Sequence, residues 1–178
     1  MRELSFRCTP SVPHMLGELS DRRGRFVLED VQRGKAIIGA DPFEVLTAHH
    51  GRDPFATLAD QLARFRQDHP TLDAPFAGGA VGCFSYDLGR SIERLPSLAR
   101  EDVPTPDFHL GLYDSALCVD SRTGVCTAVS WSGDTEAIAD WRALALTSPE
   151  TPSVVDHSPV HCAGEPVELG CDFTKADY

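Results

Sequence analysis

The sequence has few basic residues, no long hydrophobic run and no paired-cysteine motif, and each of these excludes a class of protein. Its 178 residues contain 16 Lys and Arg against 27 Asp and Glu, which gives a net charge of −11. Nucleic-acid binding depends on clustered basic side chains. The main cluster here is Arg22-Arg23-Gly24-Arg25, which we interpret as a solvated turn. We therefore expect no nucleic-acid partner.

No apolar stretch approaches the ~18 residues that cross a bilayer, so we expect no membrane partner. Residues 1–6 contain no apolar stretch of the length found in an export signal. The six cysteines form no CxxC pair, which disfavours a zinc ribbon or a redox motif. Without an export signal, we interpret them as reduced thiols and expect a cytoplasmic protein.

The order of the expected elements indicates the fold class. Chain length is that of one ordinary domain or of part of a larger one. Strands and helices alternate irregularly along the chain, which predicts an α+β fold with a mostly antiparallel sheet layered with helices. Strands are expected at 25–29, 36–39, 79–87, 116–120 and 125–131, an extended segment at 108–114, and helices at 55–68 and 135–146, with a shorter helical stretch at 15–19.

Both longer helices have recognisable start signals. Asp53 can cap free backbone N–H groups and Pro54 suits the first helical position. Asp134 is the corresponding cap of the second helix. The first helix carries an apolar stripe that we expect to be core, formed by Phe55, Leu58, Leu62 and Phe65.

The most distinctive segment is a run of glycine and apolar residues from Pro75 to Arg90. Glycine weakens a strand unless another group must come close, so we expect a buried strand that packs tightly between layers. Asp87 and Arg90 have the spacing of an ion pair that would pin the end of this strand. We interpret the run as structural rather than catalytic, with a signature formed by Gly78, Gly79, Gly82, Tyr86, Asp87, Arg90 and Glu93.

No residue emerges as a catalytic or metal-binding candidate. His49 and His50 are adjacent, so on a strand their side chains would point in opposite directions, and no acidic or Cys/His partner has ligand spacing. Ser85 lacks the glycines of a nucleophile elbow, which argues against a serine hydrolase.

Four segments occur in an order that resembles a known family. They are Leu28-Glu29-Asp30, residues 38–42, residues 75–96 and Gly111-Leu112-Tyr113-Asp114. Together they resemble the N-terminal region of the chorismate-utilising synthases, the family of anthranilate synthase component I and aminodeoxychorismate synthase component I. Leu-Gly-Arg directly after Tyr-Asp is more similar to the aminodeoxychorismate branch. The anthranilate branch remains an alternative, as does a free-standing, non-catalytic domain that binds an amino acid or a partner.

The resemblance implies a scaffolding role within a larger enzyme. The parent enzyme would aminate chorismate to aminodeoxychorismate, a precursor of 4-aminobenzoate and folate, with ammonia from a glutamine amidotransferase subunit. Its catalytic residues and magnesium would belong to a chorismate-binding domain outside this chain, so we expect no cofactor here and no activity from the isolated chain. Residues 1–147 would form part of one lobe of a two-lobed sandwich, residues 148–170 a linker, and residues 171–178 the start of the chorismate-binding domain.

Some family members bind tryptophan in a pocket of this region. By resemblance, the pocket maps onto the end of the strand at 25–29 and the loop that follows. Asp30 stands where the family has a serine, and this change adds a charge to the pocket. An ordinary polar hairpin is therefore the alternative interpretation of the mapped residues, which are Leu28, Glu29, Asp30, Gln32, Arg33, Gly34 and Lys35.

Overall fold

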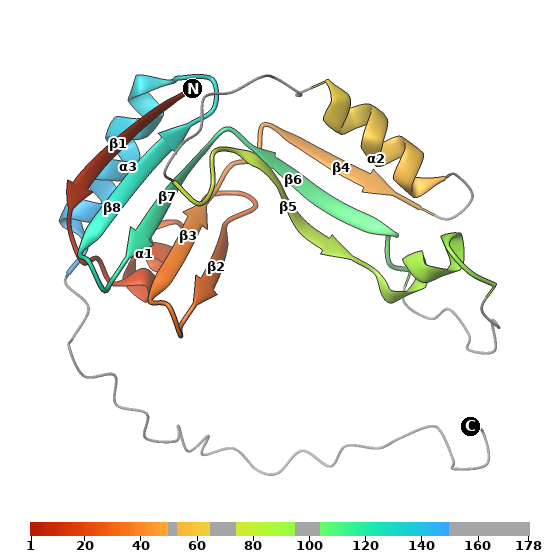
Figure 1. Ribbon diagram of the computed structural model, residues 1–178, viewed down its shortest axis with the longest axis horizontal. Helices are drawn as coiled ribbons and strands as arrows, with labels where there is room; N and C mark the ends of the chain where they lie inside the picture. Colours follow the sequence, from red (N-terminus) through yellow and green to blue (C-terminus); the bar gives the residue numbers. More distant parts are fainter. Residues whose placement is uncertain (50–52, 65–73, 95–103, 150–178) are drawn as a thin grey trace, which may run out of the picture.

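The computed structural model describes residues 1–49, 53–64, 74–94 and 104–149. Within these ranges the chain forms two antiparallel sheets that together make an arch (Figure 1). The first sheet has the spatial order β1-β8-β7-β3-β2, with bounds β1 Arg2–Arg7, β8 Val125–Ser130, β7 Ser115–Asp120, β3 Lys35–Gly39 and β2 Phe26–Asp30. The second has the order β4-β6-β5, with bounds β4 Glu44–Ala48, β6 Phe108–Tyr113 and β5 Gly79–Phe84.

Helices accompany both sheets. The α-helices are α1 Val12–Glu18, α2 Pro54–Ala63 and α3 Thr135–Thr147, and a short 3₁₀ helix, η1, spans Tyr86–Ser91. The predicted α+β class with antiparallel sheets is confirmed. Two strands, β1 and β4, were not expected from the sequence. None of the helices in the described ranges is long and apolar enough to cross a membrane.

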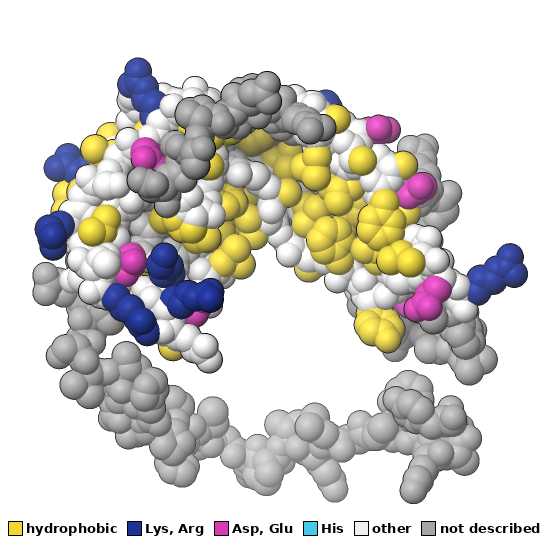
Figure 2. All heavy atoms as spheres, in the orientation of Figure 1, with side chains coloured by type: hydrophobic (Ala, Val, Ile, Leu, Met, Phe, Trp, Pro, Cys, Tyr) yellow, Lys and Arg dark blue, Asp and Glu magenta, His cyan; other side chains and the backbone are white. Residues whose placement is uncertain are grey.

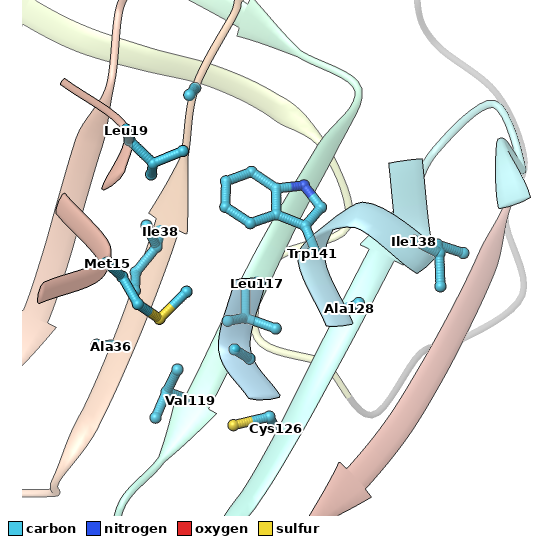
Figure 3. Close-up of a cluster of buried hydrophobic side chains, with 12 residues drawn as sticks. Met15, Leu19, Ala36, Ile38, Leu117, Val119, Cys126, Ala128, Ile138 and Trp141 are labelled. Carbon is cyan, nitrogen blue, oxygen red and sulfur yellow. The ribbon is translucent and has the colours of Figure 1, made fainter. Parts of the chain in front are cut away.

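The main core lies between the first sheet and the helices α1 and α3. Met15 of α1 is fully buried, and Trp141 of α3 is almost so. Figure 3 shows these side chains over the strands β3, β7 and β8. A fully buried side chain of this size stabilises the fold by about 1.5–3 kcal/mol relative to an exposed one. The other buried members of this core are Leu19, Ala36, Ile38, Ala40, Leu117, Val119, Cys126, Ala128, Ile138 and Ala145.

Both predicted helix caps are present. The carboxylate of Asp53 accepts hydrogen bonds from the backbone N–H groups of Phe55 and Ala56 at 3.0 and 3.1 Å. That of Asp134 accepts from Glu136 and Ala137 at 2.8 and 3.3 Å. These bonds satisfy donors that the first turn of a helix leaves free, so local sequence alone determines where α2 and α3 begin.

The second sheet has a smaller core, and the apolar stripe of α2 contributes to it only in part. Leu58 packs against the buried side chains of β4 and β6. Phe55 and Leu62 remain 42% and 40% exposed, so the expectation that the stripe is core is wrong for these two residues. The physical reason is that α2 contacts β4, and no further layer covers the stripe among the described residues. Phe65 lies outside them.

One polar junction joins the two sheets where β6 passes directly into β7. The carboxylate of Asp114 accepts hydrogen bonds from the hydroxyls of Ser130 and Ser132 at 2.8 and 3.0 Å, and from the backbone N–H of Ser132 at 2.8 Å. Ser130 is fully buried, and its hydroxyl oxygen accepts from the N–H groups of Gly133 and Asp134. This network links the junction to the start of α3, and it gives the Gly-Leu-Tyr-Asp segment a structural role.

Candidate functional site

The residues of the predicted ligand pocket lie on the hairpin formed by β2 and β3. At its turn, Asp30 accepts a hydrogen bond from the backbone N–H of Arg33 at 3.0 Å and forms an ion pair with its guanidinium at 3.2 Å. Gly34 adopts a φ of 65°, which glycine tolerates best. Its carbonyl oxygen accepts from the backbone N–H and the hydroxyl of Ser121, between β7 and β8. The charge on Asp30 therefore stabilises the turn.

The structure does not place the seven residues of the predicted pocket on one face of the first sheet. Successive side chains of a strand point to opposite faces, so Leu28 and Asp30 share one face of the first sheet and Glu29 lies on the other. Leu28 is 48% exposed, and Gln32 and Arg33 are exposed at the turn. The assignment of a ligand to this hairpin stays a prediction.

Lys35 does line a polar hollow on the face of the first sheet that carries no helix. The hollow has a volume of about 320 Å³. Glu3, Lys35 and Asp120 give it charges of both signs. The N–H groups of Thr123 and Arg122 donate to the Asp120 carboxylate and hold its pKa below the usual value. Hydroxyl groups of Ser5, Thr123 and Thr127 also line it, together with the apolar residues Ala74, Pro75, Cys118, Val119 and Val125.

A second polar cluster lies where the two sheets meet, and the sequence analysis did not anticipate it. Arg22 forms a 2.5 Å ion pair with Asp41, whose carboxylate also accepts from the backbone N–H of Arg23 at 2.9 Å. Burial opposes the charge on Asp41, but these hydrogen bonds outweigh it, and the pKa of Asp41 is lowered. Residues 22–25 lie exposed in a turn, as interpreted from the sequence, and Arg22 and Arg23 of this turn also hold the Asp41 carboxylate.

Tyr113 extends this cluster from β6. Its hydroxyl donates to the carbonyl oxygen of Gly24 at 2.5 Å, and burial together with the charge on Asp41 raises the pKa of Tyr113. An open hollow of about 570 Å³ lies beside it, lined in part by Arg23, Arg25, Phe43 and His109. Since Gly24 and Tyr113 are 89 positions apart, no local pattern could have predicted this contact.

The glycine-rich signature forms β5 and η1. The predicted ion pair is confirmed, with the guanidinium of Arg90 2.8 Å from the carboxylate of Asp87. The expectation of a buried strand is wrong, because β5 lies at the edge of the second sheet and five of its six residues are exposed. Tyr86 and Glu93 are also exposed.

Two separate structural requirements explain the glycines of the signature. Gly78 and Gly79 adopt φ values of 99° and 145°, a range that side-chain-bearing residues rarely enter. Gly82 instead lies so close to β6 that a Cβ atom would overlap the carbonyl oxygen of His109. The expected tight packing is therefore packing between neighbouring strands.

The described residues offer no candidate metal site. In the part of the chain that the structure describes, no group of three or more His, Cys, Asp or Glu side chains could hold a metal ion. His49 is exposed beyond β4, and His50 lies outside the described residues.

Comparison with known proteins relates this arrangement to a family. The sequence profile of the family described as chorismate binding enzyme matches residues 23–170, which is most of the chain. The chain belongs to the chorismate-binding enzyme family. The match covers β2 to α3 and extends into the predicted linker. The predicted domain boundaries stay predictions, because residues 150–178 lie outside the described residues.

Two groups of family members are similar to the chain. It is 42% identical over 102 residues to aminodeoxychorismate synthase component 1 of Salmonella typhimurium, covering 57% of this chain and 21% of that protein. It is 33% identical over 150 residues to anthranilate synthase component 1 of Mycobacterium tuberculosis, covering 68% of this chain and 29% of that protein. The chain thus spans about a fifth to a third of the length of these relatives.

A solved structure confirms the fold. Anthranilate synthase component I from Streptococcus pneumoniae superimposes with a TM-score of 0.50 at 21% identity, covering 68% of this chain and 30% of that one. At this identity the likeness concerns the fold alone. It supports the interpretation of the two sheets and their helices as part of the family architecture.

Proposed function

We propose that this chain is the N-terminal scaffolding region of an aminodeoxychorismate synthase component 1. The observation that carries the proposal is the 42% identity to the Salmonella typhimurium enzyme, against 33% for the mycobacterial anthranilate synthase. Leu88-Gly89-Arg90 after Tyr86-Asp87, the sequence feature that favoured this branch, forms η1 with its ion pair. The activity would be amination of chorismate to aminodeoxychorismate for 4-aminobenzoate and folate synthesis.

The partner within the enzyme would be the chorismate-binding catalytic domain, which would also supply the magnesium site. Large apolar side chains on the second sheet and near it support such a contact. Phe84 of β5 is 52% exposed, and Phe43, Val45 and Phe55 are similarly accessible. Figure 2 shows hydrophobic side chains gathered over the area of β5 and β6. Large exposed apolar patches commonly mark interaction sites.

A glutamine amidotransferase subunit would be the second partner. The relatives are named as component 1 of their synthases, which implies another component. We assign that component the task of delivering ammonia, as the resemblance implies.

Tryptophan binding is a second candidate function, favoured by the polar hollow beside the predicted hairpin. Lys35 could receive the carboxylate of an amino acid, and Glu3 or Asp120 its ammonium group. Calorimetric titration of the chain with tryptophan tests this. Heat of binding that is lost in Lys35→Ala but kept in Arg33→Ala would support a ligand site in the hollow. Absence of any heat of binding would favour the alternative, in which the residues form an ordinary polar hairpin.

A pair of chimeras tests the scaffolding role. Residues 1–149 replace the matching region of the Salmonella typhimurium enzyme in one chimera, and that of the mycobacterial anthranilate synthase in the other. We expect product formation in the first host to exceed that in the second by about tenfold or more, a difference of about 1.4 kcal/mol. The reverse preference would assign the chain to the anthranilate branch.

The isolated chain provides the necessary control. With chorismate, magnesium and ammonia it should form neither aminodeoxychorismate nor anthranilate, measured by mass spectrometry. Turnover by the chain alone would contradict the scaffolding role.

A further inference from the structure

The open hollow of about 570 Å³ where the two sheets meet, here called the junction hollow, contains acids that are already paired. Asp41 forms its 2.5 Å ion pair with Arg22, and Glu44 forms one with Arg64 at 3.0 Å. Both carboxylates of the lining therefore have a cationic partner within this chain.

Two further arginines line the junction hollow without such a partner. Among the described residues, the guanidinium groups of Arg23 and Arg25 form no hydrogen bond or ion pair, and both residues are exposed. Arg23 attracts the Asp41 carboxylate only at longer range. The hollow thus carries an excess of positive charge in a chain whose net charge is −11.

The floor of the junction hollow is apolar. Val45 of β4, Gly111 of β6 and Val81 of β5 lie opposite one another across the second sheet, and all three line the hollow. A Cβ atom on Gly111 would lie 2.8 Å from the ring of Tyr113, so a side chain at this position would crowd the floor between the two valines. The arginines precede β2 of the first sheet, so the hollow places cationic groups of one sheet beside apolar groups of the other.

The contact with the catalytic domain proposed above includes two residues of this lining, Phe43 and Val45. A surface that covers them also removes the guanidinium groups of Arg23 and Arg25 from water. Burying a charge without a counter-charge is unfavourable, whereas a guanidinium forms strong, often bidentate hydrogen bonds with a carboxylate. The covering surface therefore has to supply carboxylates to these arginines.

We propose that Arg23 and Arg25 dock an acidic segment of the chorismate-binding catalytic domain in the junction hollow. The carboxylates of that segment pair with the two guanidinium groups, and its apolar neighbours lie against Val45 and Val81. The inference rests on the proposed function and adds the chemistry of the contact. Because the hollow is lined from both sheets, the docked segment contacts both of them.

Substitution of Arg25 in the chimera with the Salmonella typhimurium enzyme tests the proposal. Arg25 is preferred to Arg23, because a change at Arg23 also alters the attraction for Asp41. Arg25→Glu should lower product formation by about tenfold or more, because it places a carboxylate against the carboxylates of the docked segment. Arg25→Gln should cause a smaller loss, and Arg25→Lys, which keeps the charge, the smallest.

A matched variant and a rescue accompany this series. Arg142→Glu makes the same change of charge on an exposed position of α3 and should leave product formation unchanged. Lysine substitutions at each Asp and Glu of the host's catalytic domain should include one that restores product formation in the Arg25→Glu chimera. Thermal unfolding of the isolated chain, followed by circular dichroism, should be the same with and without Arg25→Glu.

The outcomes separate this inference from the proposed function. An unsubstituted chimera that forms no product contradicts the proposed function, and the docking role with it. In an active chimera, the docking role alone is contradicted if Arg25→Glu has no effect or if Arg142→Glu causes an equal loss. It is likewise contradicted if no lysine substitution restores product formation, or if Arg25→Glu lowers the melting temperature of the isolated chain.

Discussion

Replacing Gly82 by alanine should destabilise the second sheet by about 3 kcal/mol, near the upper end for overpacking. A Cβ atom on Gly82 would overlap the carbonyl oxygen of His109 and lie 2.9 Å from the Cα of Leu110 and 3.0 Å from the carbonyl carbon of His109. These are backbone atoms of the adjacent strand, so no side-chain rotation can relieve the contact. β5 would have to move away from β6 and weaken the hydrogen bonds between them.

Gly17→Ala is the matched control, because a Cβ atom at Gly17 meets nothing within 4 Å. Gly17 lies in α1, where alanine should stabilise by about 0.5–1 kcal/mol. Thermal unfolding followed by far-ultraviolet circular dichroism measures both. For a chain of this size, Gly82→Ala should lower the melting temperature by roughly 6–12 °C. Equal stability of Gly82→Ala and the unsubstituted chain would refute the reasoning that close strand approach requires glycine here.

Three further substitutions or conditions test other parts of the structure. Asp134→Ala should lower the free energy of unfolding by about 1 kcal/mol through loss of the α3 cap, measured by urea unfolding; Asp134→Asn should recover most of the loss, and no recovery would argue against capping. Trp141→Phe removes the indole N–H that donates to the Ser115 hydroxyl at 3.0 Å, and should cost about 1–2 kcal/mol in the same assay, whereas a neutral effect would mean that the bond contributes nothing. Burial raises the pKa of Cys118 to about 11 and that of Cys126 to about 12, from an ordinary value of 9.0. Above about pH 9 the unfolded chain therefore loses thiol protons that the folded chain keeps, so the free energy of unfolding should fall with rising pH and be insensitive to these thiols below that value. The double alanine variant of the two cysteines should show a smaller fall between about pH 8 and about pH 10, and an unchanged slope would contradict this account.

The sequence predicted best the features that depend on neighbours along the chain. Asp53 and Asp134 cap their helices because the carboxylate of a cap and the backbone N–H groups that donate to it are three residues apart or fewer. The Asp87–Arg90 pair forms within a single turn of η1. The strand β1 escaped prediction because its charged residues obscure the alternation, and only pairing with β8 makes it a strand. Short β4 likewise depends on pairing with β6.

By itself, the sequence determined the fold class, the helix starts, the β2–β3 and β7–β8 hairpins and, through its motifs, the family. These follow from hydrogen bonds and periodicities that span a few residues. Only the tertiary structure decided that the glycine-rich strand is an exposed edge, that Tyr113 reaches Gly24, and that Lys35 faces a polar hollow while Glu29 faces away. Burial and contact at these positions depend on which distant strands lie alongside, and a strand's own residues do not encode that choice.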